Sequence, residues 1–234
     1  MLQYAKFQIK CHITTIRCPP VYKDKAGPDQ VSKEHLDSIL LPLHILKGRL
    51  STTPKPLTSP KISKSTITMS VLEVGDSFPG NVSFGYIPFT PETKDITSCG
   101  IPIKFDASTE FKNKKVVIVA VPGAFTPTCQ ANHLPGFIQN IDALKAKGVE
   151  QVVVIASNDP FVMSAWGKAN YTKDDFIIFA SDSELAFSKA IGWTMGDRTA
   201  RYAIAVDHGK VIYAAKETER GVDVSGADAV LAKL

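Results

Sequence analysis

The stretch from Val121 to Gln130 reads VPGAFTPTCQ and joins an apolar run to a segment of helix length. The apolar run, Val116 to Val121, has the length and composition of a buried strand, and a Pro-Gly pair ends it. Thr126 is suited to cap the helix that follows through its hydroxyl. Pro127 suits the first helical position, where its missing N–H needs no partner. This stretch therefore predicts a strand that leads directly into a helix.

Cys129 falls in the first turn of this predicted helix. Free backbone N–H groups and the positive end of the helix dipole favour a thiolate at such a position. A nucleophilic or redox role competes with a simpler one, in which Cys129 is buried apolar filler at a strand end. The geometry of a helix start does not by itself decide between the two.

The spacing of Pro122, Thr126 and Cys129 is P-x-x-x-T-x-x-C. This spacing resembles the active-site signature of the peroxiredoxins, thiol peroxidases with a thioredoxin-like fold. The longer run from Pro122 to Phe137, PGAFTPTCQANHLPGF, is similar to the type-five subfamily. It is most similar to the fungal branch of alkyl hydroperoxide reductases and peroxisomal peroxiredoxins.

The resemblance extends from about Ser70 to Leu234. Three further blocks follow in the family's order: NDPFVMSAWGKAN (158–170), ASDSELAFSKAIGW (180–193) and RYAIAVDHGKVIYAAKE (201–217). Residues 1–69 have no part in it. The resemblance implies one thioredoxin-like domain over residues 70–234, with a central mixed sheet flanked by helices.

The resemblance also implies site roles for particular residues. Cys129 is the implied peroxidatic nucleophile, whose thiolate attacks the terminal peroxide oxygen and becomes a sulfenic acid. Thr126 is expected to orient the peroxide, because its hydroxyl both donates and accepts hydrogen bonds. Pro122 is expected to close the edge of the pocket. Arg201 directly precedes an apolar run, where the family carries the arginine that stabilises the departing oxygen. Arg198, in the loop before it, is expected to be solvated.

A second thiol condenses with the sulfenic acid in many such enzymes. Residues 219–230, where animal type-five members carry their resolving cysteine, contain none. Cys99 lies 30 residues before Cys129 (129 − 99), close to the place of the resolving cysteine in fungal alkyl hydroperoxide reductases. In those enzymes the disulfide crosses between subunits. The resemblance therefore implies that Cys99 resolves Cys129 across a homodimer and that thioredoxin reduces the disulfide.

Two alternatives stay open at this point. Cys99 could be a spectator thiol in a one-cysteine peroxidase that glutathione or another small thiol reduces directly. A non-enzymatic redox sensor or chaperone on the same fold would use the same sulfenic acid. In every case hydrogen peroxide and alkyl hydroperoxides are the expected oxidants, and no metal or organic cofactor is expected, because the cysteines and histidines lack ligand spacing.

His133 lies four residues after Cys129 and could share its helix face. A Cys–His pair would suggest a protease-like nucleophile. The resemblance instead gives the HLPG block a structural role, and Pro135 is expected to kink the helix. Trp166 and Trp193 are expected in the core.

Apolar runs and helix-length segments alternate along residues 116–234. The predicted strands are 116–121, 152–156, 176–179, 202–206 and 211–215, the last two joined by an Asp-His-Gly turn. The predicted helices are 128–147, 160–170, 183–191 and 225–234. Earlier, residues 74–79 and 81–89 alternate like an edge hairpin, and residues 90–115 are polar and turn-rich. This order predicts an α/β fold, a mixed sheet covered by helices on both faces.

The net charge of +4 divides unevenly over the 234 residues. Residues 1–69 hold 11 Lys/Arg against 4 Asp/Glu (+7), whereas residues 70–234 hold 16 against 19 (−3). The predicted domain has no basic stripe, so no nucleic-acid partner is expected. No run of eighteen apolar residues is present, and no membrane-spanning helix is predicted.

Residues 1–69 are basic and rich in Ser, Thr and Pro. We expect a disordered tail, a targeting leader, or upstream sequence if translation starts at Met69. The final tripeptide, Ala232-Lys233-Leu234, resembles the S-K-L peroxisomal address. Cytoplasm and peroxisome are therefore the expected compartments, with the mitochondrion open if residues 1–69 act as a leader.

Overall fold

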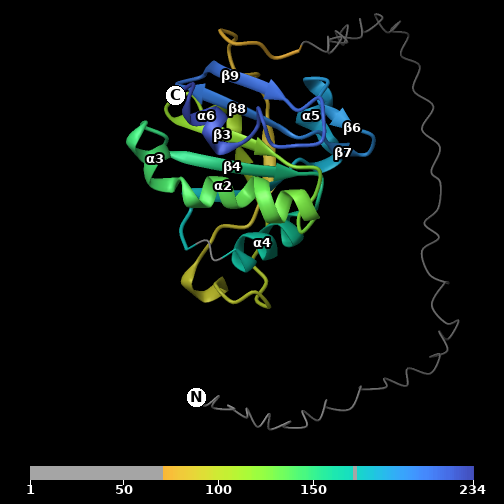
Figure 1. Ribbon diagram of the computed structural model, residues 1–234. Helices are drawn as coiled ribbons and strands as arrows, with labels where there is room; N and C mark the ends of the chain where they lie inside the picture. The colour runs from red at the N-terminus through yellow and green to blue at the C-terminus, as the bar shows by residue number, and fades with distance from the viewer. Residues whose placement is uncertain (1–70, 171–172) are drawn as a thin grey trace, which may run out of the picture. The chain divides into compact units, whose positions relative to one another are not determined.

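The computed structural model describes residues 71–170 and 173–234. These residues form a seven-stranded mixed sheet with helices on both of its faces (Figure 1). This arrangement confirms the predicted α/β fold. The prediction for residues 1–69 lies outside the described residues.

The middle of the sheet is parallel and both edges are antiparallel. The strand order is β2-β1-β5-β4-β3-β8-β9, in which β3, β4 and β5 run parallel. The main strands are β1 (Ser83–Tyr86), β2 (Ile103–Asp106), β3 (Lys115–Ala120), β4 (Gln151–Ala156), β5 (Ile177–Ser181), β8 (Tyr202–Asp207) and β9 (Lys210–Lys216). A small separate ribbon pairs β6 (Thr194–Met195) with β7 (Arg198–Thr199). All five strands predicted from residue 116 onward are thus present.

The helices are short. They are α1 (Ala107–Glu110), α2 (Leu134–Gln139), α3 (Ile141–Ala146), α4 (Pro160–Ala169), α5 (Ala186–Ala190) and α6 (Ala227–Leu231). One π-helical turn, η2 (Cys129–His133), precedes α2, and two 3-10 turns are η1 (Pro91–Thr93) and η3 (Ser183–Leu185). Among the described residues, none of these helices is both long and apolar enough to cross a bilayer.

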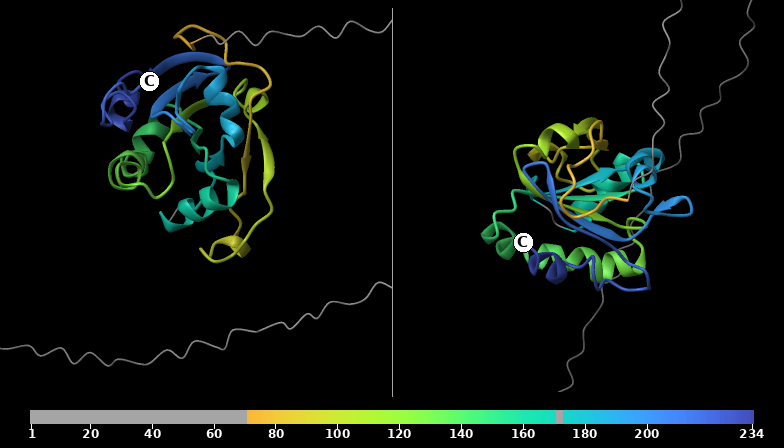
Figure 2. Two further views of the ribbon diagram at one scale, coloured as in Figure 1. Left: turned by 90° about the vertical axis from the view of Figure 1, so that its right-hand side faces the viewer. Right: turned by 90° about the horizontal axis from the view of Figure 1, so that it is seen from above.

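Strand β3 divides the core into two layers, because alternate side chains of a strand face opposite sides of the sheet. Val117 and Val119 join a buried cluster with α2, α4 and α6, and this cluster includes Cys129. Val116 and Ile118 join the other cluster, which α1 and α5 cover. Figure 2 shows the helices on the two sides of the sheet. Cys129 therefore belongs to the α2–α4–α6 face.

The predicted edge hairpin is wrong. Strand β1 pairs antiparallel with β2 on one side and β5 on the other, while Ser77 makes only an isolated bridge to Lys210. Strand β2 lies inside the stretch that looked turn-rich. Of its four residues only Phe105 is buried, so the strand has too little apolar patterning to be seen in the sequence.

The predicted helix 128–147 is broken into three segments. The Leu134 N–H bonds to the Cys129 carbonyl across a π turn, just before Pro135, which has no N–H to continue the ladder. The chain breaks again at Asn140, whose side-chain amide donates to the Gly136 carbonyl at 2.9 Å. The kink that was predicted at Pro135 is therefore a π turn just before it. Residues 183–191 are likewise interrupted, because Glu184 and Leu185 are left-handed (φ 57° and 58°).

The predicted turn between the last two strands is confirmed. Strands β8 and β9 pair antiparallel, and His208 and Gly209 between them both have positive φ (47° and 79°). Two successive positive φ values are typical of the tight hairpin turn whose twist matches that of the strands.

Gly167 lets α4 pack closely on the sheet. A Cβ at this position would lie 2.7 Å from the ring of Phe179 on β5. We predict that Gly167→Ala lowers the free energy of unfolding by about 1–3 kcal/mol, because overpacking outweighs the gain in helix propensity. Urea denaturation measures this change in the free energy of unfolding. Gly80→Ala, where the added Cβ meets nothing within 4 Å, is the matched control. A Gly167→Ala protein as stable as the wild type would contradict the packing argument.

Candidate active site

The sheet brings together two residues that lie 72 positions apart. Strands β3 and β8 pair antiparallel with Ala120 opposite Tyr202. The carboxyl end of β3 therefore lies beside the amino end of β8. Arg201 directly precedes β8, and the helix that carries Cys129 begins just beyond β3. The position predicted for Arg201, immediately before a strand, is confirmed.

The sulfur of Cys129 lies against the guanidinium of Arg201. The Nη2 group of Arg201 donates to Cys129 Sγ at 3.5 Å. Cys129 has no exposed surface, whereas Arg201 is half-buried. A buried thiolate is costly without a nearby positive charge, and this contact supplies one. Arg198, by contrast, is exposed, as predicted.

The loop between β3 and the helix is held by three hydrogen bonds. The Val121 carbonyl accepts a bond from the buried Thr199 hydroxyl at 2.5 Å, and the Val121 N–H donates to the Ile155 carbonyl at 2.9 Å. The side-chain oxygen of Asn158, just after β4, accepts from the Ala124 N–H at 2.9 Å. These bonds fix the path of the chain into the first helical turn.

The role predicted for the Thr126 hydroxyl in capping is wrong. The hydroxyl donates to the Gly123 carbonyl at 2.8 Å, and no side-chain cap is formed at the start of η2. The loop turns back on itself here, because Phe125 has φ 58°, which places the hydroxyl against its own loop. Helical geometry begins at Pro127 as predicted, and the Thr126 carbonyl accepts from the Gln130 N–H at 2.8 Å. The Thr126 hydroxyl oxygen keeps lone pairs that can accept a bond from another donor. Pro122, in the same loop, is half-buried.

His133 is a buried member of the site that the sequence did not identify. Its Nε2 lies 2.9 Å from the Ser225 carbonyl, and its Nδ1 lies 3.0 Å from Arg201 Nη1. A carbonyl only accepts and a guanidinium only donates, so Nε2 carries the proton and Nδ1 accepts. The imidazole therefore binds the arginine and not the sulfur. The spacing of four residues from Cys129 was the available signal, but it suggested a contact with the cysteine instead.

Burial keeps the imidazole of His133 neutral. It lowers the pKa of His133 from its ordinary 6.5 to about 4. The bond to the Ser225 carbonyl opposes this shift, and the charge of Arg201 adds to it. Protonation would remove the Nδ1 acceptor and place a second cation beside the guanidinium. A neutral His133 is therefore required for this arrangement of Arg201.

Cys99 lies apart from this cluster, on the loop between η1 and β2. It is exposed, and both Cys99 and Cys129 are free thiols. Lys168 of α4 anchors the loop, because its Nζ donates to the Ser98 carbonyl at 2.8 Å. Figure 1 shows this loop, in yellow, extending beyond α4. Its exposure makes Cys99 available to another protein chain.

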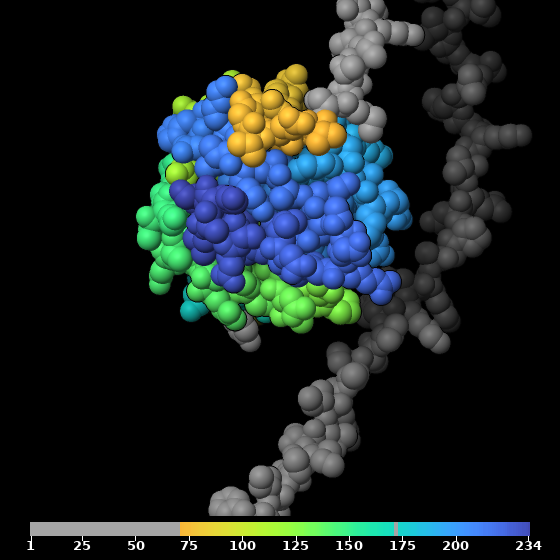
Figure 3. Space-filling model, turned by 45° about the horizontal axis from the view of Figure 1, so that its top comes forward, coloured from red at the N-terminus to blue at the C-terminus, as the bar shows by residue number. Residues whose placement is uncertain are grey.

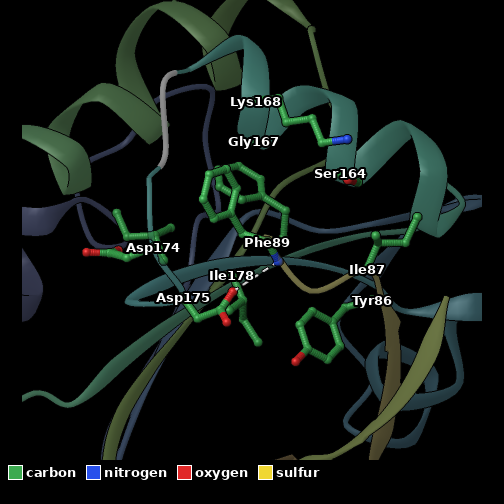
Figure 4. A pocket seen from close by; sticks show the side chains of 11 residues that line it. Tyr86, Ile87, Phe89, Ser164, Gly167, Lys168, Asp174, Asp175 and Ile178 are labelled. Atoms are coloured by element: carbon green, nitrogen blue, oxygen red, sulfur yellow. Dashed lines mark hydrogen bonds between the residues drawn. The ribbon is translucent and has the colours of Figure 1, made fainter. Parts of the chain in front are cut away.

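A small cavity lies beside the anchoring lysine. Figure 4 shows it between the segment after β1, the strand β5 and α4, with Lys168 at its rim. The Phe89 N–H donates across it to Asp175 at 3.4 Å. Its free volume is about 30 Å³, enough for one water, and it includes neither cysteine. It is therefore separate from the Cys129 site.

Over residues 71–170 and 173–234, no three His, Cys, Asp or Glu side chains are grouped so as to hold a metal ion. Trp166 and Trp193 are both buried, as predicted. The chemistry visible in this part of the chain is that of a cysteine sulfur at a helix start, facing a guanidinium. On this fold, such a site defines a thiol-dependent redox protein of the thioredoxin-like class.

Comparison with known proteins narrows this class. The family model described as Redoxin matches residues 73–231. The chain is 56% identical to peroxiredoxin Pen c 3 of Penicillium citrinum over 165 residues, which covers 70% of this chain and 99% of that protein. It is 54% identical to a putative peroxisomal peroxiredoxin of Lipomyces kononenkoae, covering 68% and 99% of the two chains.

Among solved structures, the chain is similar to reduced Prx3 of Vibrio vulnificus in complex with hydrogen peroxide. The identity is 37%, the TM-score is 0.60, and 69% of this chain and 98% of that chain are covered. The thioredoxin-like fold is thereby confirmed. The chain belongs to the peroxiredoxin family, and this membership supports thiol peroxidase activity.

The lowered pKa of His133 predicts a loss of stability in acid. Between about pH 6.5 and pH 4 the unfolded chain binds a proton at His133 that the folded chain does not. The folded state should therefore lose about 3 kcal/mol as pH falls through this window. Denaturant unfolding at several pH values measures this loss. His133→Gln should flatten the dependence of the free energy of unfolding on pH between pH 4 and 6.5. An unchanged dependence would show that other groups are responsible.

Proposed function

We propose that this protein is a thioredoxin-dependent peroxiredoxin that reduces hydrogen peroxide and alkyl hydroperoxides. Cys129 is the peroxidatic cysteine, Cys99 is the resolving cysteine, and Thr126, Arg201 and Pro122 complete the pocket. The observation that carries the proposal is the 3.5 Å contact between the Arg201 guanidinium and Cys129 Sγ. A guanidinium in that place can both favour the thiolate and polarise a bound peroxide.

In the first step the Cys129 thiolate attacks the terminal oxygen of the peroxide. An S–O bond forms, the O–O bond breaks, and the distal oxygen leaves as alkoxide or hydroxide, which takes a proton from solvent. Sulfur is oxidised by two electrons to the sulfenic acid. Arg201 stabilises the charge that develops on the leaving oxygen, and the acceptor capacity of the Thr126 hydroxyl serves to orient the peroxide O–H. The Vibrio vulnificus relative, solved with hydrogen peroxide, supports this class of substrate.

In the second step the Cys99 thiol condenses with the sulfenic acid, so that a disulfide forms and water leaves. Cys99 is exposed whereas Cys129 is buried, which suits a cysteine that reacts with the site of another subunit. Thioredoxin then reduces the disulfide by exchange of its own dithiol, which restores both thiols.

We place this reaction in a homodimer. Phe125 and Phe161 are 52% and 50% exposed. Both flank the site loop, since Phe125 precedes Thr126 and Phe161 follows Asn158, which binds the loop. Large exposed aromatic rings are enriched where protein surfaces associate. In the proposed homodimer a second copy covers this face and supplies its Cys99 to Cys129.

For the compartment we propose the peroxisome or the cytoplasm. The fungal relative named a peroxisomal peroxiredoxin supports the former. A mitochondrial location would depend on residues 1–69 acting as a leader.

The two cysteines should have separable effects. Cys129→Ser should abolish peroxide consumption with a thioredoxin system, because no sulfur remains to be oxidised. Cys99→Ser should still react once with peroxide but lose turnover with thioredoxin and the disulfide-linked dimer on a non-reducing gel. The other two cysteines, Cys11 and Cys18, lie in residues 1–69, outside the resemblance. Cys11→Ser and Cys18→Ser are therefore matched controls and should retain both the turnover and the disulfide-linked dimer. A Cys99→Ser enzyme that turns over normally with thioredoxin would exclude Cys99 as the resolving residue.

Replacing each of the two arginines near the site should have very different effects on the rate of the reaction with hydrogen peroxide. Arg201→Ala should slow the reaction of Cys129 with hydrogen peroxide by about 100-fold or more, the effect of removing a preorganised electrostatic contact. Arg198→Ala, at an exposed arginine, should stay within about twofold of the wild type, as a surface charge does little. Stopped-flow fluorescence gives both rate constants. Equal losses in the two variants would mean that general positive charge, and not the contact with Sγ, drives the reaction.

A further inference from the structure

Glu217 lies beyond the site yet is tied to it through the backbone. It directly follows β9, and its N–H donates to the Arg201 carbonyl at 2.9 Å. Its side chain is half-buried and makes no ion pair with any described residue. The carboxylate is instead occupied by hydrogen bonds to the segment that leads into α6.

One carboxylate oxygen of Glu217 accepts three hydrogen bonds. The donors are the Val224 N–H at 2.9 Å, the Ser225 N–H at 2.7 Å and the Ser225 hydroxyl at 2.7 Å. Bonds to an ionised acceptor are shorter and stronger than those between neutral groups. Together they fix residues 224 and 225, which precede α6 and have no regular secondary structure of their own.

The fixed segment reaches the catalytic sulfur through two further residues. The Ser225 carbonyl accepts from His133 Nε2 at 2.9 Å, and His133 Nδ1 accepts from Arg201 Nη1 at 3.0 Å. The other terminal nitrogen of Arg201 contacts Cys129 Sγ at 3.5 Å. Every link after the carboxylate is buried or half-buried. In Figure 3 the blue C-terminal residues lie directly against the green cysteine-bearing helix, which agrees with this connection.

We propose that Glu217 is a positioning residue for the peroxidase reaction: through Ser225 and His133 it holds the Arg201 guanidinium over the sulfur of Cys129. The inference rests on the proposed function. Arginine has a long side chain with large rotamer freedom, and its guanidinium is useful only where it meets the reacting sulfur. When the Ser225 carbonyl is fixed, its bond to Nε2 fixes the orientation of the His133 ring. Nδ1 of the fixed ring then accepts from Arg201 and holds the guanidinium in place.

The test is the second-order rate constant of Cys129 with hydrogen peroxide, measured by stopped-flow on the full chain. Glu217→Ala should lower it about tenfold. Glu217→Gln should stay within about twofold, because the amide oxygen can accept the same three bonds. Glu219→Ala, at an exposed acidic residue two positions on, is the matched control and should match the wild type. A wild-type rate for Glu217→Ala would overturn the proposal.

A double-mutant cycle separates positioning from a general structural effect. In an Arg201→Ala background, Glu217→Ala should have no further effect on the rate, because the group it positions is gone. An equal tenfold loss in both backgrounds would show that Glu217 acts by another route and would overturn the proposal.

A third variant decides the matter if Glu217→Ala does not fold. Glu217→Asp keeps the charge but withdraws the oxygen by one methylene, so it should be slower than Glu217→Gln. A Glu217→Asp rate equal to or above that of Glu217→Gln would overturn the proposal. Failure of the proposed function looks different: wild type and Cys129→Ser would then consume peroxide at the same rate.

Discussion

The contact between the Arg201 guanidinium and the Cys129 sulfur is the constraint on which the rest of the site depends. It exists because β8 runs antiparallel to β3, so that the start of one strand lies at the end of the other. A fully buried sulfur would otherwise be a plain apolar side chain in the α2–α4–α6 layer. The sheet pairing brings a cation to it and makes a core cysteine a candidate nucleophile.

The surroundings of this pair are built to restrict movement. The loop before the helix is tied to β4 and to the β6–β7 ribbon, and the guanidinium is tied to the segment before α6 by way of His133. Such support belongs to sites whose geometry must be ready before the substrate arrives. Cys99 has the opposite character, since it lies exposed on a loop that α4 anchors through a single lysine. A buried Cys129 and an exposed Cys99 together suit the two-step cycle that we propose.

Local sequence determined the central strands, the last hairpin and the place where a strand leads into a helix at Pro127. Each depends on neighbouring residues: apolar runs of strand length, an Asp-His-Gly turn, and a proline at a first helical position. Spacing and resemblance were sufficient for the family, and they predicted as site residues Cys129 and Arg201, which the structure brings into contact at 3.5 Å. The β2 edge was not predictable, because β2 has little apolar patterning of its own and β1 is placed by its pairing with β2 and β5.

Only the tertiary structure decided what surrounds the sulfur. The Thr126 hydroxyl turned toward Gly123 because of the left-handed Phe125, and His133 met Arg201 because a π turn and the antiparallel pairing of β3 with β8 brought them together. Glu217 joined the network from the far end of β9. The sequence predicted Cys129 as the candidate nucleophile, because the P-x-x-x-T-x-x-C spacing that marks it is local. Its partners lie dozens of residues away, and their approach is set by sheet register, which no local pattern encodes.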